Sequence, residues 1–197
     1  MRIQILALCL LCSCSYHVRP TQEQAEIQAT VHLVSLEGSC SGVAIGRKSI
    51  LTAAHCVGAI NVAFDYTGKV LCRATPVKVD EDEDVALLRT HCDLPVRAPI
   101  GTSEPVMGTR ATVTGYPLGV NFPVKTDGYL TTAVKTQGLS YNKQVLSAPT
   151  VGGNSGGPVW VNGEVVGIVS VGAEIYHHIN FVVRQSVIQK FLAGVKL

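Results

Sequence analysis

Short runs rich in β-branched and aromatic residues follow one another along most of the chain, separated by residues that favour turns. Asn162-Gly163 between two such runs predicts a tight hairpin, because both residues accept positive φ angles. Twelve runs are predicted to be strands: residues 30–36, 41–46, 49–54, 61–66, 69–79, 85–90, 110–116, 128–136, 144–149, 157–163, 164–172 and 179–183.

The hydrophobic pattern changes to a helical one only near the C-terminus. Within residues 184–195, the apolar residues Val187, Ile188, Phe191 and Leu192 fall on one face of a helix. Strands that recur at intervals of about 8 to 12 residues, followed by one helix, indicate an all-β fold. The pattern leaves a sandwich and a pair of barrels as alternatives.

Composition supports one folded domain and excludes some partners. The chain has 197 residues, is 47% hydrophobic and carries a formal charge of +2, so it can form a core and is not disordered. No basic stripe with interleaved aromatics is present, and nucleic acid is therefore not an expected partner. The acidic run at residues 80–84 lacks the regular ligand spacing of a calcium loop, so we expect no metal there.

The N-terminal residues differ from the rest of the chain. Residues 1–14 begin with one positive charge and continue with an apolar run too short to span a bilayer, which is typical of an export signal. The end of this segment resembles the lipobox of bacterial lipoproteins, with Cys14 at the lipidated position. Ordinary signal cleavage, an uncleaved anchor and a misassigned start remain alternatives. The polar residues 15–29 are expected to form a tether before a domain at residues 30–197.

Four of the seven cysteines lie outside the signal, which allows two disulfides and favours an oxidising compartment. Cys72 and Cys92 lie at equal distances from Asp82. A turn at the acidic run would place them opposite each other on antiparallel strands. Cys40 is then expected to pair with Cys56; four reduced thiols are the alternative.

Candidate chemistry centres on the glycine-rich stretch PTVGGNSGGPVW, residues 149–160. A serine becomes a useful nucleophile only with a base, a group that orients the base, and donors for the oxyanion. Glycine permits the backbone angles that bring such donors together, and Gly153 and Ser155 are the two positions whose N–H groups are expected to converge. The same stretch could instead be only a turn between two strands.

The base and its orienting group are sought elsewhere in the chain. His55 follows small alanines in LTAAHCVG, which leaves its imidazole room to face a cleft. Asp84 precedes the apolar run VALL, so the start of a strand would bury its carboxylate beside an imidazole. Asp80 and Asp82 compete for this role, but neither leads directly into a buried strand. His55 alone could equally be a core histidine.

Together, TAAHC, DVALL and GNSGGP in this order resemble the chymotrypsin-like serine proteases, from about Val31 to Leu192. The resemblance implies two six-stranded antiparallel β-barrels with a short C-terminal helix. It implies His55 as base, Asp84 as its orienter, Ser155 as nucleophile, and Gly153 with Ser155 as the oxyanion hole. No metal or organic cofactor is implied.

The resemblance also implies a substrate cleft. The strand containing Ser170, Val171 and Gly172 would pair with an extended peptide. Pro149 stands where trypsin-like pockets carry an acid, so a preference for Lys or Arg is not expected. Thr150 matches a hydroxyl of the glutamyl endopeptidases, but the histidine that those enzymes use is absent near Val169. We therefore expect a small or medium apolar side chain before the scissile bond.

Departures from the animal enzymes point to bacterial relatives. Asn154 replaces the aspartate that precedes the serine in trypsin-type enzymes, whereas GNSG and INFVV are similar to the HtrA/DegP group. The residues after Leu192 leave no room for a PDZ domain in this sequence. The prediction is an exported endopeptidase of peptides or proteins, bound to a membrane at most through a lipid on Cys14. Alternatives are a catalytically silent relative that binds peptides or a partner, and an esterase.

Overall fold

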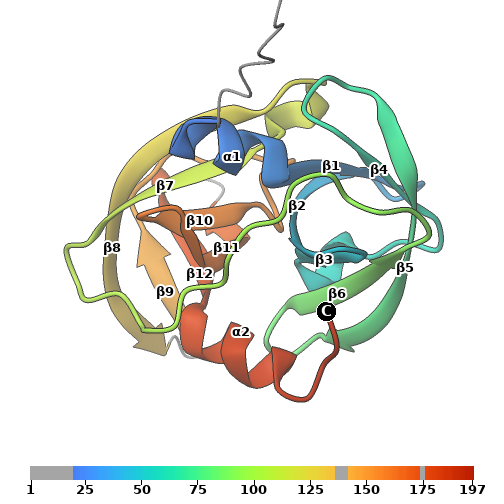
Figure 1. Cartoon of the computed structure of the whole chain (residues 1–197). Helices are drawn as coiled ribbons and strands as arrows, with labels where there is room; N and C mark the ends of the chain where they lie inside the picture. Colours follow the sequence, from blue (N-terminus) through green and yellow to red (C-terminus); the bar gives the residue numbers. More distant parts are fainter. Residues whose placement is uncertain (1–19, 136–141, 174–175) are drawn as a thin grey trace, which may run out of the picture.

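The computed structural model describes residues 20–135, 142–173 and 176–197. The expected signal segment, the lipidation position Cys14 and residues 15–19 lie outside these ranges. Two closed barrels lie side by side, and helices cover opposite ends of their junction (Figure 1). Neither helix in the described residues is long and apolar enough to cross a membrane.

The first barrel is formed by the N-terminal half of the chain. Its strands close in the order β1-β2-β3-β6-β5-β4, and every pairing is antiparallel. The strands are β1 (Thr30–Val34), β2 (Ser39–Gly46), β3 (Ser49–Thr52), β4 (Asn61–Phe64), β5 (Val70–Asp80) and β6 (Val85–Thr90).

The second barrel repeats this design with the C-terminal half. Its strands close in the order β10-β11-β12-β9-β8-β7, again with antiparallel pairs. The strands are β7 (Arg110–Gly115), β8 (Val124–Lys135), β9 (Asn142–Leu146), β10 (Pro158–Val161), β11 (Glu164–Ala173) and β12 (Tyr176–Arg184). The barrel pair predicted from the family resemblance is therefore confirmed, and the sandwich is excluded.

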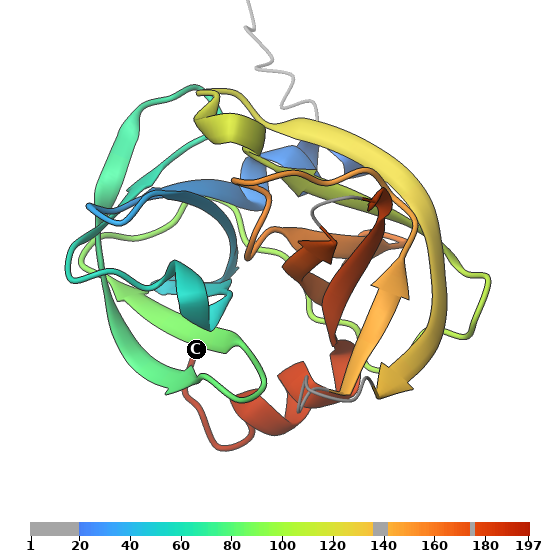
Figure 2. The ribbon, with the colours of Figure 1, turned by 180° about the vertical axis from the view of Figure 1, so that it is seen from behind.

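The predicted C-terminal helix is α2 (Gln185–Leu192), whose Ile188 and Phe191 are buried in a core cluster shared with both barrels. After α2 the chain returns to the first barrel, as the view from behind shows (Figure 2). There the Arg89 guanidinium donates a 2.8 Å hydrogen bond to the carbonyl oxygen of Lys196. The last residues thus connect the second barrel back to the first.

Two disulfides cross-link the first barrel, in the pairing expected from the sequence. Cys40 bonds to Cys56, and Cys72 bonds to Cys92. The second bridge forms because β5 and β6 meet in a hairpin whose turn contains the acidic run at residues 80–84. Disulfides of this kind are typical of oxidising compartments.

The structure differs from the expected tether at residues 15–29, because residues 22–29 form a packed helix, α1 (Gln22–Ala29). Thr21 caps it in a capping box with Gln24. The helix attaches through Glu26, which is 4% exposed. Its Oε2 forms an ion pair with Nζ of Lys125 on β8, at 2.8 Å. Hydrophobic periodicity could not predict α1, because its buried face has no apolar stripe. The buried residues are Glu26, which is paired with Lys125, and Ala29.

We predict that Glu26→Ala will destabilise the protein by about 2 kcal/mol. The change leaves the Lys125 ammonium, which is 22% exposed, without its buried partner. Urea unfolding at neutral pH measures the effect. Glu23→Ala is the matched control, since Glu23 faces the same lysine at 3.7 Å but is exposed, and should change stability little. Equal effects of the two changes would contradict the assigned role of Glu26.

Candidate active site

His55 and Asp84 meet at one edge of the first barrel. His55 lies in the short 3-10 helix η1 (Ala54–Cys56) that follows β3, and Asp84 ends the turn between β5 and β6. The imidazole Nδ1 lies 2.9 and 3.0 Å from the two carboxylate oxygens, and the His55 backbone N–H donates to Oδ1 at 3.1 Å. Asp84 therefore holds both the ring and the backbone N–H of His55.

Asp84 is nearly inaccessible, with 8% of its surface exposed, and its backbone adopts the left-handed value φ 53°. The Ser170 hydroxyl donates a second side-chain hydrogen bond to its Oδ2. Burial has the largest influence on the pKa of Asp84 and raises it. Hydrogen bonds from His55 and Ser170, with the charge of His55, outweigh burial and hold this pKa below its ordinary value. Asp84 is thus a carboxylate at neutral pH.

Ser155 lies in the glycine-rich loop before β10. Gly153 and Gly156 on either side have φ angles of 95° and 77°, where a Cβ atom would collide with the backbone of Tyr116 and Ser41 respectively. The Ser155 hydroxyl is partly buried and donates a 3.4 Å hydrogen bond to the Ser170 carbonyl oxygen. Glycine at these positions is therefore a steric requirement.

The Cys40–Cys56 disulfide is a common neighbour of His55 and Ser155. A ring nitrogen of His55 lies within 4.8 Å of both sulfur atoms, and the Cys56 sulfur lies 3.5 Å from the Ser155 carbonyl oxygen. The two sulfurs are bonded to each other, so they offer no thiolates and this cluster is not a metal site. The first barrel supplies His55 and Asp84, while the second supplies Ser155.

Ser41 on β2 fastens the serine loop to the first barrel. Its N–H donates to the Ser155 carbonyl at 2.8 Å, and its hydroxyl donates to the Gly153 carbonyl at 2.7 Å. The same hydroxyl accepts the Tyr116 N–H at 2.9 Å. The sequence does not reveal this role of Ser41, since its position next to Cys40 says nothing about a loop more than 100 residues away.

Within the described part of the chain, neither the Gly153 N–H nor the Ser155 N–H donates to another protein group. The loop around them is held by other bonds: Leu118 N–H donates to the Gly152 carbonyl, and Asn154 N–H donates to the Val151 carbonyl. Both predicted oxyanion donors therefore remain available beside Ser155.

The predicted substrate-binding residues come from two segments that both adjoin Asn180. Ser170, Val171 and Gly172 are on β11, where Gly172 pairs with Asn180 of β12. Thr150 is buried and donates its hydroxyl to the Asn180 side-chain oxygen. Ser170 differs from expectation in one respect, since its side chain faces Asp84 while its carbonyl faces Ser155.

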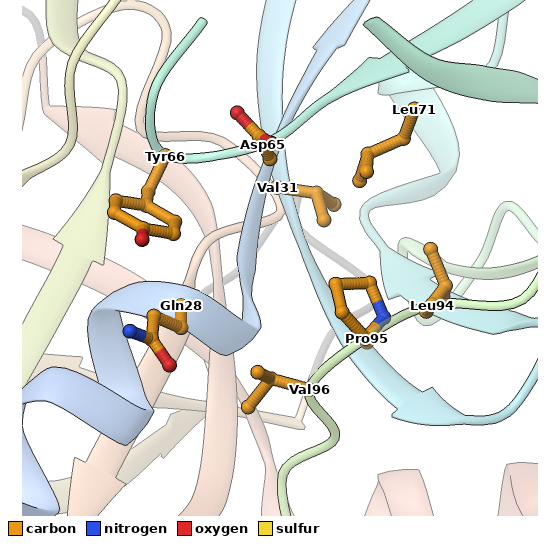
Figure 3. Close-up of a pocket in the computed structure, with 9 residues that line it drawn as sticks. Gln28, Val31, Asp65, Tyr66, Leu71, Leu94, Pro95 and Val96 are labelled. Carbon is orange, nitrogen blue, oxygen red and sulfur yellow. The ribbon is translucent and has the colours of Figure 1, made fainter. Parts of the chain in front are cut away.

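A cavity of about 170 Å³ lies at the first barrel, beside α1 and away from these residues (Figure 3). Six apolar residues and three polar ones, Gln28, Asp65 and Tyr66, line it; the apolar ones are Val31, Ala44, Leu71, Leu94, Pro95 and Val96. Its lining contains no nucleophile paired with a base, so the candidate catalytic site is the cluster between the barrels.

Comparisons with known proteins agree with this geometry. Residues 40–168 match the family model of the trypsin-like peptidase domain. Alpha- and beta-fibrinogenase OhS1 of Ophiophagus hannah is 27% identical across 86% of this chain and 84% of its own length. The putative mitochondrial protease Do-like 12 of Arabidopsis thaliana is 31% identical across 66% of this chain, but this covers only 28% of that protein.

Solved structures show the same fold. The active form of the Rv3671c protease from M. tuberculosis superimposes with a TM-score of 0.80 at 24% identity, covering 89% of this chain and 85% of that one. The serine endoprotease from Yersinia pestis gives a TM-score of 0.74 at 25% identity, covering 89% of this chain and 66% of that one.

The lowered pKa of Asp84 predicts a specific loss of stability in acid. A carboxylate whose pKa is lower in the folded state stabilises the protein above its unfolded pKa of about 3.9, and this contribution is lost as pH falls through the folded pKa. Asp84→Asn should therefore show a shallower decline of unfolding free energy below about pH 4.

Denaturant unfolding between neutral pH and pH 3 measures this decline. Asp82→Asn, an exposed change in the same turn, should retain the acid slope of the unmodified protein. An unchanged slope in Asp84→Asn would show that this carboxylate does not couple folding to pH.

Proposed function

Because this chain belongs to the trypsin-like peptidase family, and its relatives are serine proteases, we propose that Ser155, His55 and Asp84 form its catalytic triad. The observation that carries the proposal is the contact of the His55 imidazole with the buried Asp84 carboxylate, at 2.9 Å. A carboxylate in this position holds Nδ1 protonated, which leaves Nε2 free to accept a proton.

In the proposed reaction, His55 Nε2 takes the proton from the Ser155 hydroxyl as Oγ attacks the substrate carbonyl carbon. Asp84 stabilises the imidazolium without taking its proton. The tetrahedral intermediate collapses when His55 gives the proton to the leaving amine. Water then hydrolyses the acyl-enzyme through the same base, and Ser155 is regenerated.

The hydroxyl of Ser155 must change partner for this step. It donates to the Ser170 carbonyl at 3.4 Å, a long and therefore weak hydrogen bond. Rotation about the Cα–Cβ bond would redirect it toward His55, which lies against the same disulfide as Ser155. Contacts between nucleophile and base are often loose before substrate binds.

The N–H groups of Gly153 and Ser155 are the proposed oxyanion donors. Their freedom from other protein acceptors in the described residues supports this role. The Ser41 hydroxyl, which donates to the Gly153 carbonyl, keeps the loop in place before the reaction. Preorganised donors of this kind stabilise the developing charge without a reorganisation cost.

The proposed substrate is an extended peptide that adds to β11 at Ser170, Val171 and Gly172. Thr150 is proposed to border the pocket for the residue before the scissile bond. Its hydroxyl is paired with Asn180, and Pro149 carries no charge, which supports a small or medium apolar side chain there.

Export is a further part of the proposal. The two disulfides indicate an oxidising compartment, and the expected signal at residues 1–14 would deliver the chain there. Lipidation of Cys14 or ordinary signal cleavage would then decide between a membrane-anchored and a released enzyme.

A catalytically silent, peptide-binding relative is the rival function. Such a protein has no need of a buried carboxylate held against an exposed imidazole, and the retention of all three triad residues favours the enzyme. An esterase of the GxSxG type would place its serine between a strand and a helix, whereas Ser155 lies between a loop and β10.

We predict that a fluorophosphonate probe will label the folded protein at Ser155, with mass mapping of the adduct as the measurement. His55→Ala should lower the labelling rate by at least about 1000-fold, since an unassisted serine hydroxyl is a poor nucleophile. Ser155→Ala gives the background, and His178→Ala, which changes an exposed histidine, is the matched control. Folded protein that gives no adduct would favour the silent relative.

A further inference from the structure

A buried lysine of the second barrel reaches the turn that carries Asp84. Lys143 lies on β9 and is only 4% exposed, and its Nζ donates a 2.6 Å hydrogen bond to the Glu83 carbonyl oxygen. Lysine is among the residues most rarely buried, because removing an ammonium group from water is costly. Its neighbours must therefore compensate for that cost.

The compensating groups belong to the acidic run. Burial has the largest effect on the pKa of Lys143 and lowers it, while the charges of Asp84, Glu83 and Asp80 oppose that decrease. Glu83 Oε2 is itself buried and has no hydrogen-bond partner in the described residues. The charge of Lys143 therefore also offsets the burial of this carboxylate.

Lys143 and His55 act on the same carboxylate. Asp84 accepts hydrogen bonds from His55 and Ser170, and it also attracts Lys143 electrostatically. The ammonium is therefore a charge close to the proposed base, although it touches neither His55 nor Ser155 through any described hydrogen bond.

We propose that Lys143 is a positioning residue for the proposed triad, and the inference rests on that function. Its hydrogen bond holds the peptide group that joins Glu83 to Asp84, at the residue whose φ is 53°. Its positive charge offsets part of the attraction of Asp84 for the imidazolium. Loss of this charge is expected to strengthen the pairing of Asp84 with the imidazolium.

Two variants separate the hydrogen bond from the charge. Lys143→Gln keeps a neutral donor, and Lys143→Met removes both donor and charge. Lys78→Met is the matched control, because Lys78 on β5 also donates to a distant carbonyl, that of Phe191 in α2, but does not contact the Asp84 turn through any described hydrogen bond.

The first measurement is the rate of fluorophosphonate labelling of Ser155 as a function of pH. Both Lys143 variants should raise the midpoint of the acid limb by about 0.5 pH unit, since a nearby cation is lost. Lys143→Met should also lower the maximal rate by about tenfold, because Asp84 loses its anchor, while Lys143→Gln should stay within about twofold. Lys78→Met should move neither quantity.

The second measurement is an NMR titration of the His55 ring in a Ser155→Ala background, which requires no activity. The midpoint should rise in both Lys143 variants. A folded Lys143 variant with an unchanged midpoint, or an equal shift in Lys78→Met, would overturn the inference. Should Lys143→Met not fold, Lys143→Gln decides the outcome. Absence of labelling in the unmodified protein would instead refute the proposed triad, so the two failures are distinguishable.

Discussion

The arrangement of the site depends on one buried carboxylate. Asp84 sits almost out of contact with solvent, where an isolated negative charge is unfavourable. Three groups stabilise it: the ring and backbone of His55, and the hydroxyl of Ser170. Because those groups come from both barrels, satisfying the charge also fixes how the barrels meet. The contacts that stabilise the Asp84 charge are therefore the same contacts that set the geometry of the proposed triad.

The serine loop meets a steric constraint rather than an electrostatic one. Gly156 lies so close to the first barrel, and Gly153 so close to the backbone of Tyr116, that side chains would not fit. Ser41 also ties two carbonyl oxygens of the loop to β2. The first barrel thus shapes a loop that belongs to the second. A nucleophile held this way has little freedom except rotation of its own side chain, which is the freedom that the proposed reaction requires.

Most of the fold and the candidate residues could be predicted from local sequence. Runs of β-branched residues predicted the strands, and an apolar stripe with helical spacing predicted α2. His55, Asp84 and Ser155 lie in short motifs that resemble those of a known family. The disulfides followed from a single hairpin. These features share one property: the signal lies within a few residues of the feature itself.

Features that depend on distant partners could not be predicted. α1 was expected to be a tether because its polar residues show no apolar stripe. Its ion pair with Lys125, about 100 positions away, is invisible in the local sequence. Ser41 and Lys143 look unremarkable in sequence, since their roles arise from loops brought beside them by barrel closure. The second role of Ser170, as a donor to Asp84, was hidden for the same reason.

Each end of the described chain is bonded to the barrel that lies farther from it in sequence. α1 precedes the first barrel but is paired to β8 of the second, while Lys196 follows the second barrel but is bonded to the first. Each barrel is thus bonded to the terminal segment that adjoins the other barrel in sequence. During synthesis, the first barrel emerges from the ribosome before either of these contacts can form. His55 and Asp84 are therefore made well before the loop that contains Ser155, and the candidate site can assemble only when translation is nearly finished.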